Sequence, residues 1–219
     1  MEPKLQFLVL VANEEHLCFA EMICDEMYLS AQARGTGIAR RNPQYIQEKM
    51  REGKAVIALT TSGVWAGFCY IETWSHGKYV ANSGLIVAPA FRKYGLAKRI
   101  KQKVFELSRK RYPDAKIFGL TTGLAVMKIN ADLGYEPVTY SELTQDEAFW
   151  KGCASCVNHE ILLAKERKNC LCTAMLFDPI TAKTKKSIWD VAKRSGLYGR
   201  WMQLKTNRLL TEKTQKTNP

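Results

Sequence analysis

The 219-residue sequence contains no long hydrophobic run. A helix that spans a membrane needs about 20 consecutive apolar residues, and no segment approaches that length. Near the N-terminus, Leu5–Val11 is too short and too soon interrupted to be the hydrophobic core of a secretory signal. We therefore expect a cytoplasmic protein without a membrane partner.

The sequence also lacks the pattern of a secreted domain held together by disulfides. Its seven cysteines are an odd number, and no export signal accompanies them. Free thiols or metal ligands are therefore expected in place of a disulfide framework. The content of 46% hydrophobic and 25% charged residues is that of an ordinary globular protein. The length suits one well-buried domain with an appendage, or two small domains.

Acidic residues are scarce at the end of the chain. Residues 180–219 hold ten lysines and arginines but only two acidic residues, a balance of +8 within a net charge of +12. This basic tail has one short segment of helical periodicity, Ser187–Arg194, and aromatic residues at Trp189, Tyr198 and Trp201. Such a tail could bind nucleic acid. The alternative is that it docks on its own domain or on the neighbouring subunit of a homodimer.

The centre of the sequence is an apolar strand, a basic turn and a helix. The strand Leu85–Val87 leads into a turn with one glycine and several cations, which are Arg92, Lys93, Gly95, Lys98 and Arg99. The helix then carries its apolar residues on one face, at Leu96, Ile100, Val104 and Leu107. The first amides of a helix have no intrahelical partner and attract anions. The segment therefore predicts an anion site, which Gly95 would let the main chain approach closely.

The spacing Arg92-x-x-Gly95-x-Ala97, after a strand that ends in Val87-Ala88-Pro89, resembles the pyrophosphate loop of the GNAT N-acyltransferases. The resemblance implies that main-chain atoms of the strand hold the pantetheine arm and thioester of acetyl-CoA or succinyl-CoA. It also implies that amides of the loop hold the phosphates. The residues expected at the cofactor are Leu85, Ile86, Val87, Arg92, Lys93, Tyr94, Gly95, Leu96, Ala97, Lys98 and Asn130.

The expected elements follow the order β-α-α-β-β-β-α-β-α-β. Periodicity alone indicates only an α/β or α+β protein, whereas the resemblance implies the GNAT fold over residues 1–165. In that fold a central mixed sheet with a splayed strand pair is flanked by helices. The expected strands are 5–11, 55–60, 64–73, 79–87, 116–122 and one from residue 135; the helices are 14–33, 43–52, 95–111 and 124–133. Asn13 and Asn42 are the expected caps of the first two helices.

Further segments are similar to the acetyltransferase domain of N-acetylglutamate synthases. Gly37-x-x-x-Arg41 precedes the second helix, Leu120-Thr121-Thr122 ends a strand, and Gly134-Tyr135-Glu136-Pro137-Val138 follows the last helix. The similarity covers roughly residues 5–163. It implies a small-molecule acceptor, glutamate, and a role in arginine biosynthesis. The alternatives are a protein or polyamine amine as acceptor, or a non-catalytic module that binds CoA or nucleic acid.

The residue for proton transfer is less clear in the sequence. Many GNAT enzymes have a carboxylate on the strand before the loop, where this chain has Ala81. Glu72, His76 and Asn82 are the catalytic candidates nearby, and His76 has an ordinary pKa near neutrality. The alternative for His76 and Glu72 is a solvated position, with a water relaying the proton. A tyrosine common in the last helix is replaced by Asn130, which can donate a hydrogen bond but no proton.

Arginines in a glycine-rich loop are candidates for the acceptor site. Guanidinium groups bind carboxylates in bidentate geometry, so Arg34, Arg40 and Arg41 would suit a dicarboxylic amino acid; the alternative is a solvated basic loop. Trp74 and Thr121 are added as acceptor-site candidates. An arginine that the family has just after the Leu-x-Thr strand is missing, because that position is Gly123.

Four cysteines near the end of the predicted domain form a separate pattern. Cys153-x-x-Cys156 precedes an apolar segment, Val157–Ala164, and Cys170-x-Cys172 precedes another, Thr173–Phe177. Read as two strands, these segments would form a hairpin over residues 150–179 that brings both pairs together. Four thiolates suit a tetrahedral structural zinc. The alternative is four thiols packed at the base of the hairpin.

Overall fold

The computed structural model describes residues 5–33, 35, 40–154, 156–182 and 184. The chain divides into two units, Met1–Asp178 and Pro179–Pro219. The helix predicted at 187–194 and the aromatic residues of the basic tail lie outside the described residues, as does Arg34. Among the described residues, no helix has the length and apolar character needed to cross a membrane.

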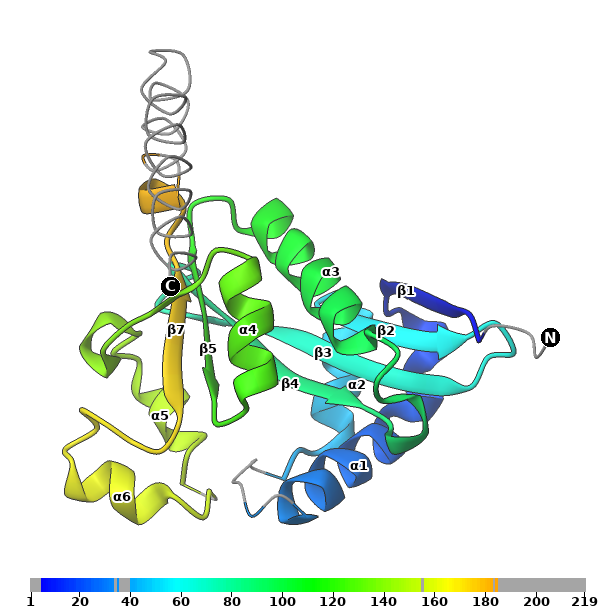
Figure 1. Ribbon diagram of the computed structural model, residues 1–219, viewed down its shortest axis with the longest axis horizontal. Helices are drawn as coiled ribbons and strands as arrows, with labels where there is room; N and C mark the ends of the chain where they lie inside the picture. Colours follow the sequence, from blue (N-terminus) through cyan, green and yellow to red (C-terminus); the bar gives the residue numbers. More distant parts are fainter. Residues whose placement is uncertain (1–4, 34, 36–39, 155, 183, 185–219) are drawn as a thin grey trace, which may run out of the picture. The chain divides into compact units, whose positions relative to one another are not determined.

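The first unit is built on a mixed sheet of seven strands in the order β1-β2-β3-β4-β5-β7-β6 (Figure 1). Neighbouring strands are antiparallel except for β4 and β5, which are parallel. The strands are β1 Phe7–Val11, β2 Ala55–Thr60, β3 Trp65–Trp74, β4 Tyr79–Val87, β5 Lys116–Thr121, β6 Glu136–Pro137 and β7 Thr173–Phe177. The predicted mixed sheet is therefore confirmed.

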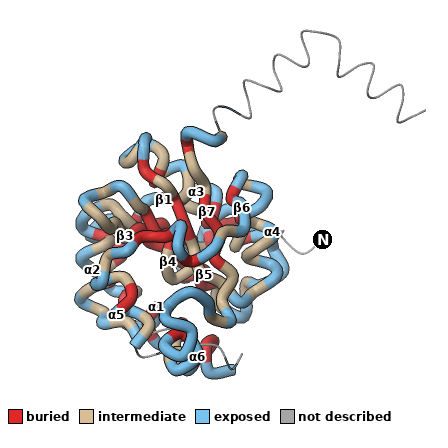
Figure 2. Tube along the Cα trace, turned by 90° about the vertical axis from the view of Figure 1, so that its left-hand side faces the viewer, coloured by how far each residue is buried: buried red, intermediate tan, exposed pale blue. Residues whose placement is uncertain are grey.

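Helices cover both faces of this sheet. The α-helices are α1 Ala20–Ala33, α2 Pro43–Arg51, α3 Leu96–Arg111, α4 Leu124–Asp132, α5 Glu147–Lys151 and α6 His159–Ala164. The 3-10 helices are η1 Glu14–Phe19, η2 Pro89–Phe91 and η3 Tyr140–Glu142. α3 and α4 lie on one face and α1 and α2 on the other (Figure 1). The strands between them form the buried centre of the molecule (Figure 2).

Strand register fixes which side chains share a face. Glu72 of β3 pairs with Ala81 of β4, Ala81 pairs with Phe118 of β5, and Phe118 pairs with Leu176 of β7. Paired residues of adjacent strands point to the same side, so this row of side chains faces away from α3. The row joins the hydrophobic core under α1 and α2 to the core formed with α5 and α6.

β4 and β5 separate after three residue pairs, which confirms the predicted splayed pair. Their register runs from Tyr79↔Lys116 to Ala81↔Phe118, while β4 continues to Val87 and β5 to Thr121. An irregularity in the β3–β4 register coincides with Gly84, whose φ is +64°. A Cβ at Gly84 would lie 2.5 Å from Cε1 of Tyr70, so glycine is needed where β4 bends away.

Three expected elements differ from the structure. The predicted strand Val157–Ala164 is helix α6, so the expected cysteine hairpin is wrong. Both edges of β7 are already paired, one with β5 and the other with β6, and no edge remains for such a strand. The first helix begins with the 3-10 turn η1, capped by Asn13 as expected. The strand expected from residue 135 is reduced to Glu136–Pro137.

Candidate active site between β4, β5 and the start of α3

The start of α3 is open. Gly95 is the residue before the helix, has a φ of +72°, and would place a Cβ more than 4 Å from any other heavy atom. No side chain caps the first turn of the helix. The first amides of α3 therefore have no side-chain partner among the described residues, which is an arrangement that attracts an anion.

Most of the cations around this turn are bound by the protein itself. Arg92 donates through Nη2 to Oε1 of Glu26 at 3.2 Å and to Oγ of Ser30 at 2.8 Å, both on α1. Lys98 pairs with Asp132 at 2.8 Å, and Arg99 donates to the Phe7 carbonyl at 2.9 Å. Lys93, in contrast, has no ion pair within the described part of the chain. Main-chain amides and Lys93 are thus the groups left for an anion, and Arg92 braces the loop against α1.

Within the described part of the chain, the edge of β4 that faces β5 is also unpaired from Asn82 onward, since the ladder ends at Ala81. An extended ligand with amide groups can hydrogen-bond such an edge as an added strand would. The strand Leu85–Val87 leads directly to η2 and the start of α3. One continuous surface therefore offers an extended ligand a strand edge at one end and helix amides at the other.

A carboxylate lies next to the position where the sequence has Ala81. Glu72 is directly opposite Ala81 in the β3–β4 register, on the face that carries α1 and α2. The Tyr45 hydroxyl of α2 donates to Oε1 of Glu72 at 2.6 Å. Burial, and then the charge of Glu72, raise the pKa of Tyr45, so this hydroxyl stays protonated and acts as a donor.

Arg41 is the loop arginine that lies beside Glu72. Burial opposes its charge, but Tyr70 and Glu72 outweigh this effect and raise the pKa of Arg41 above its ordinary value. Its Nε is buried and has no hydrogen-bond partner among the described residues, and the same holds for the Tyr70 hydroxyl. Arg40, by contrast, lies over the Tyr28 ring at 5.1 Å. Arg41 is therefore a half-buried cation beside Tyr70 and Glu72, and its Nε is buried without a partner among the described residues.

The other predicted acceptor and catalytic residues are scattered. His76 is exposed in the β3–β4 turn, as expected for a solvated position. Trp74 follows Glu72 on the same face and packs edge-on against Phe149 at 5.6 Å. Thr121 accepts a hydrogen bond from the Gly123 amide at 3.0 Å, within its own turn.

Two asparagines lie toward the opposite face. Asn82 is buried and donates to Ser108 of α3 at 2.8 Å, while the Tyr135 hydroxyl donates to its Oδ1 at 2.9 Å. The structure therefore does not bring Asn82 together with Glu72. Asn130 is 1% exposed and lies near Gly119 of β5, and its Oδ1 has no partner among the described residues.

The arrangement resembles that of solved acetyltransferase structures. N-acetylglutamate synthase from Neisseria gonorrhoeae, complexed with coenzyme A and N-acetyl-glutamate, matches with a TM-score of 0.56 and 13% identity; the match covers 80% of this chain and 36% of that one. Rv2747 from Mycobacterium tuberculosis, in complex with CoA and NLQ, matches with a TM-score of 0.54 and 15% identity over 78% and 98% of the two chains. The chain has the GNAT fold.

A third GNAT-fold neighbour is yncA from Salmonella typhimurium, solved with acetyl-CoA. It matches with a TM-score of 0.52 and 13% identity, covering 80% of this chain and 94% of that one. The chain thus spans about a third of the synthase but nearly the whole of the two smaller proteins. No family model matches the chain, and the search of curated proteins gave no match.

Sequence reasoning missed two tyrosines and a lysine of this GNAT fold. Tyr70 and Tyr45 surround Glu72, and the strand period of two, which puts Tyr70 on the face of Glu72, was a signal for the first. Lys101 of α3 is only 2% exposed. Its Nζ lies 3.4 Å from Oδ1 of Asn82 and 5.2 Å from the centre of the Tyr135 ring. Burial lowers the pKa of Lys101 to about 8.

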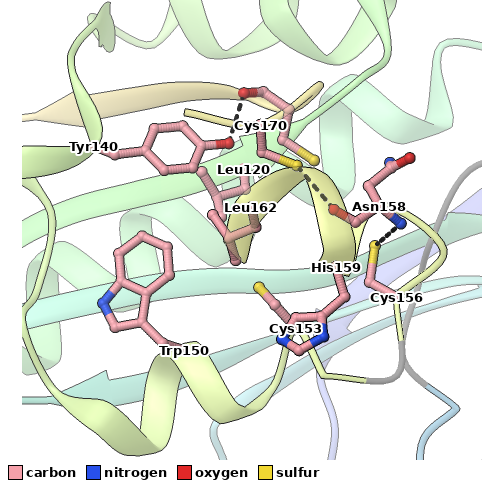
Figure 3. A pocket seen from close by; sticks show the side chains of 10 residues that line it. Leu120, Tyr140, Trp150, Cys153, Cys156, Asn158, His159, Leu162 and Cys170 are labelled. Atoms are coloured by element: carbon pink, nitrogen blue, oxygen red, sulfur yellow. Dashed lines mark hydrogen bonds between the residues drawn. The ribbon is translucent and has the colours of Figure 1, made fainter. Parts of the chain in front are cut away.

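The four cysteines Cys153, Cys156, Cys170 and Cys172 line one cavity of ≈ 30 Å³ with His159, Trp150 and Leu162 (Figure 3). We refer to these four cysteines as the cysteine cluster. The Asn158 amide donates to Sγ of Cys156 at 3.4 Å, and Sγ of Cys170 donates to the Asn158 carbonyl at 3.8 Å. Burial, and then the other three thiols, raise the pKa of Cys172 to about 12. As they stand, the described residues contain no group of three or more His, Cys, Asp or Glu arranged to hold a metal ion.

Proposed function

We propose that the chain is an acyl-CoA-dependent N-acyltransferase whose acceptor is the amino group of free glutamate. The observation that carries this proposal is the continuous surface from the unpaired edge of β4 to the open start of α3. GNAT-fold neighbours solved with CoA or acetyl-CoA support the donor class.

The donor site would be formed mainly by main-chain groups. The edge of β4 over Leu85–Val87 would hydrogen-bond the amides of the pantetheine arm, and the first amides of α3 would hold the pyrophosphate. The free space beside Gly95 fits such an anion. Lys93 would add a charge, and Arg92 would position the loop through Glu26 and Ser30. Acetyl-CoA and succinyl-CoA share all the groups held in this way, so either can be the donor.

The acceptor site would be formed on the face of β3 that carries Glu72. Arg41 would bind a carboxylate of glutamate through its guanidinium group. The N. gonorrhoeae synthase that shares the fold was solved with N-acetyl-glutamate, which supports a dicarboxylic acceptor. A cationic acceptor such as a lysine side chain or a polyamine would be repelled by Arg41.

Glu72 would accept the proton that the amino group must lose before its nitrogen attacks. The Tyr45 hydroxyl would hold the carboxylate in place. Bound acyl-CoA supplies an activated thioester carbonyl, whose bond to sulfur breaks as the amide bond to nitrogen forms and the nitrogen releases its second proton to solvent. Asn130 cannot provide a proton to the departing sulfur, so that proton would come from solvent.

We place this reaction in arginine biosynthesis and in the cytoplasm. The resemblance to the N-acetylglutamate synthases implies this pathway. The seven cysteines are all free thiols, which fits a reducing compartment.

A CoA-release assay with purified protein tests the proposal. Acetyl-CoA and succinyl-CoA are each combined with the twenty common free amino acids, a polyamine and a basic peptide. Release that depends on glutamate supports the proposal and identifies the donor. CoA release with only the peptide or the polyamine would contradict glutamate as the acceptor. Absence of CoA binding would contradict the assignment of the chain as an acyl-CoA-dependent enzyme.

A further inference from the structure

We propose that the cysteine cluster binds one zinc ion. The two cysteine pairs are contributed by segments on either side of α6, and the fold brings them to one cavity although the expected hairpin is absent (Figure 3). The four cysteines therefore come together without the hairpin that the sequence predicts.

The chemistry of the cavity favours a soft divalent cation. Its lining includes four thiols and the His159 imidazole, together with apolar groups of Leu120, Trp150 and Leu162. No carboxylate lines it, so the hard cations magnesium and calcium have no oxygen ligands there. Four thiolates in an apolar setting are a tetrahedral ligand set for zinc.

The local main chain already makes contacts with the sulfur atoms. Asn158 donates to Cys156 and accepts from Cys170, so it connects one cysteine pair to the other. A metal would replace the thiol protons and draw the sulfur atoms inward, because ligands reach their final positions when the metal binds. The described residues thus bring the four thiols to one cavity but not to metal-binding distances of one another, and binding would have to complete their arrangement.

Zinc at this position would hold in place the segment that packs against Trp74, a candidate residue of the acceptor site. The Tyr140 hydroxyl donates to the Cys172 carbonyl at 2.8 Å, and Trp150 packs on Tyr140. The next residue, Phe149, contacts Trp74 and Phe118 of the sheet. The ion would tie α5, α6 and the start of β7 together beside Trp74. The site would therefore have a structural role and would touch no reacting atom.

Metal analysis of the full chain tests this proposal. The protein is purified under reducing conditions without chelator, and zinc and iron are measured by mass spectrometry. The expected result is one zinc per chain. A thiol-blocking mercurial should release the same amount of zinc. Reconstitution of the protein with cobalt should give the visible spectrum of a tetrahedral site with four thiolate ligands.

Matched variants locate the ligands. Cys172→Ser should lose the zinc, whereas Cys18→Ser, which alters an exposed cysteine of η1, should keep it. His159→Gln should also keep it, because four thiols complete the coordination. Loss of zinc from His159→Gln would overturn the four-thiol assignment. The proposal would be overturned if the wild-type protein, purified under reducing conditions, bound no zinc or contained iron in its place. Disulfides between cysteines of the cluster in the protein as isolated would also overturn it. None of these results depends on acyl transfer.

Discussion

The Tyr45 hydroxyl donates to Oε1 of Glu72 at 2.6 Å, across 27 positions of sequence and from helix to strand. The contact fixes a carboxylate directly opposite Ala81, the position where a base was expected and is missing. The carboxylate is thus supplied by β3, one strand away from the expected place. Arg41 lies near Glu72 and adds a cation there; in the proposed reaction Glu72 would take the proton of the amino group and Arg41 would bind a carboxylate.

Replacing Glu72 should remove the proton acceptor while the fold and the donor site stay intact. We expect Glu72→Gln to lower kcat by about 10² to 10⁴-fold, the range typical of general-base loss, with little change in the KM for acyl-CoA. Steady-state kinetics with each substrate varied will show this. Tyr45→Phe, which only loosens the carboxylate, should have a smaller effect. An unchanged kcat in Glu72→Gln would mean that water alone relays the proton.

Replacing Arg41 should weaken the acceptor selectively. A hydrogen bond to a charged group contributes about 1.5–3 kcal/mol, so we expect Arg41→Gln to raise the KM for glutamate by roughly 10- to 100-fold. The KM for acyl-CoA should change much less. Arg40→Gln is the matched control, since Arg40 stacks on Tyr28. A role of Arg41 in the acceptor site would be contradicted if Arg41→Gln changed the KM values for glutamate and acyl-CoA equally. It would also be contradicted if Arg40→Gln had the same effect as Arg41→Gln.

A side chain at Gly95 should block the donor site. Gly95→Val has space in the free protein, because nothing lies within 4 Å of a Cβ there, but its methyl groups would occupy the anion position. CoA binding measured by titration calorimetry should be lost. Gly63→Val is the control for backbone strain: its φ is +82° and its surroundings are equally open. CoA affinity that is equal in the two variants would contradict the pyrophosphate assignment.

Lys101 should make stability depend on pH. Burial lowers its pKa from 10.5 to about 8, so the unfolded chain binds more protons than the folded one between these values. The destabilising effect is then complete below about pH 8 and disappears as the pH rises to 10.5. We expect Lys101→Met to raise the free energy of unfolding at pH 7 by on the order of 1–3 kcal/mol.

Urea unfolding at several pH values checks the Lys101 prediction. The difference between Lys101→Met and wild type should shrink as the pH rises, and Lys110→Met, at an exposed position of the same helix, should show no such trend. A Lys101→Met variant that is less stable than wild type at pH 7 would show that the contacts of Lys101 with Asn82 and Tyr135 outweigh the effect of burial.

Local signals predicted the parts of the fold that depend on local physics. Asn13 and Asn42 cap helices where expected, and α3 begins directly after the glycine-containing turn, as the sequence predicts. The segment Ile161–Ala164 could not be assigned in this way, since four apolar residues fit a strand or a helix. Its conformation is decided by the edges of β7, which depend on strands distant in sequence.

Side-chain roles at the site depended even more on distant contacts. Arg92 was expected at the phosphates, but its guanidinium is held by Glu26, which is 66 positions away. Asn82 is a candidate in the sequence because it is adjacent to Ala81, yet it is buried with Tyr135 and Ser108 on the other face. The position of Glu72 opposite Ala81 could be expected from the sequence, because this strand pairing follows from a hairpin; its role as the base stays a prediction.

The most direct test of acyl transfer to glutamate is a competition. Purified wild-type protein is incubated with one acyl-CoA and equal concentrations of glutamate, glutamine and lysine, and the products are identified by mass spectrometry. We predict that N-acylglutamate is the main product, because the Arg41 cation recognises a second carboxylate and repels a cationic side chain. A mixture rich in acyl-lysine, or CoA binding without any acylated amino acid, would contradict this account.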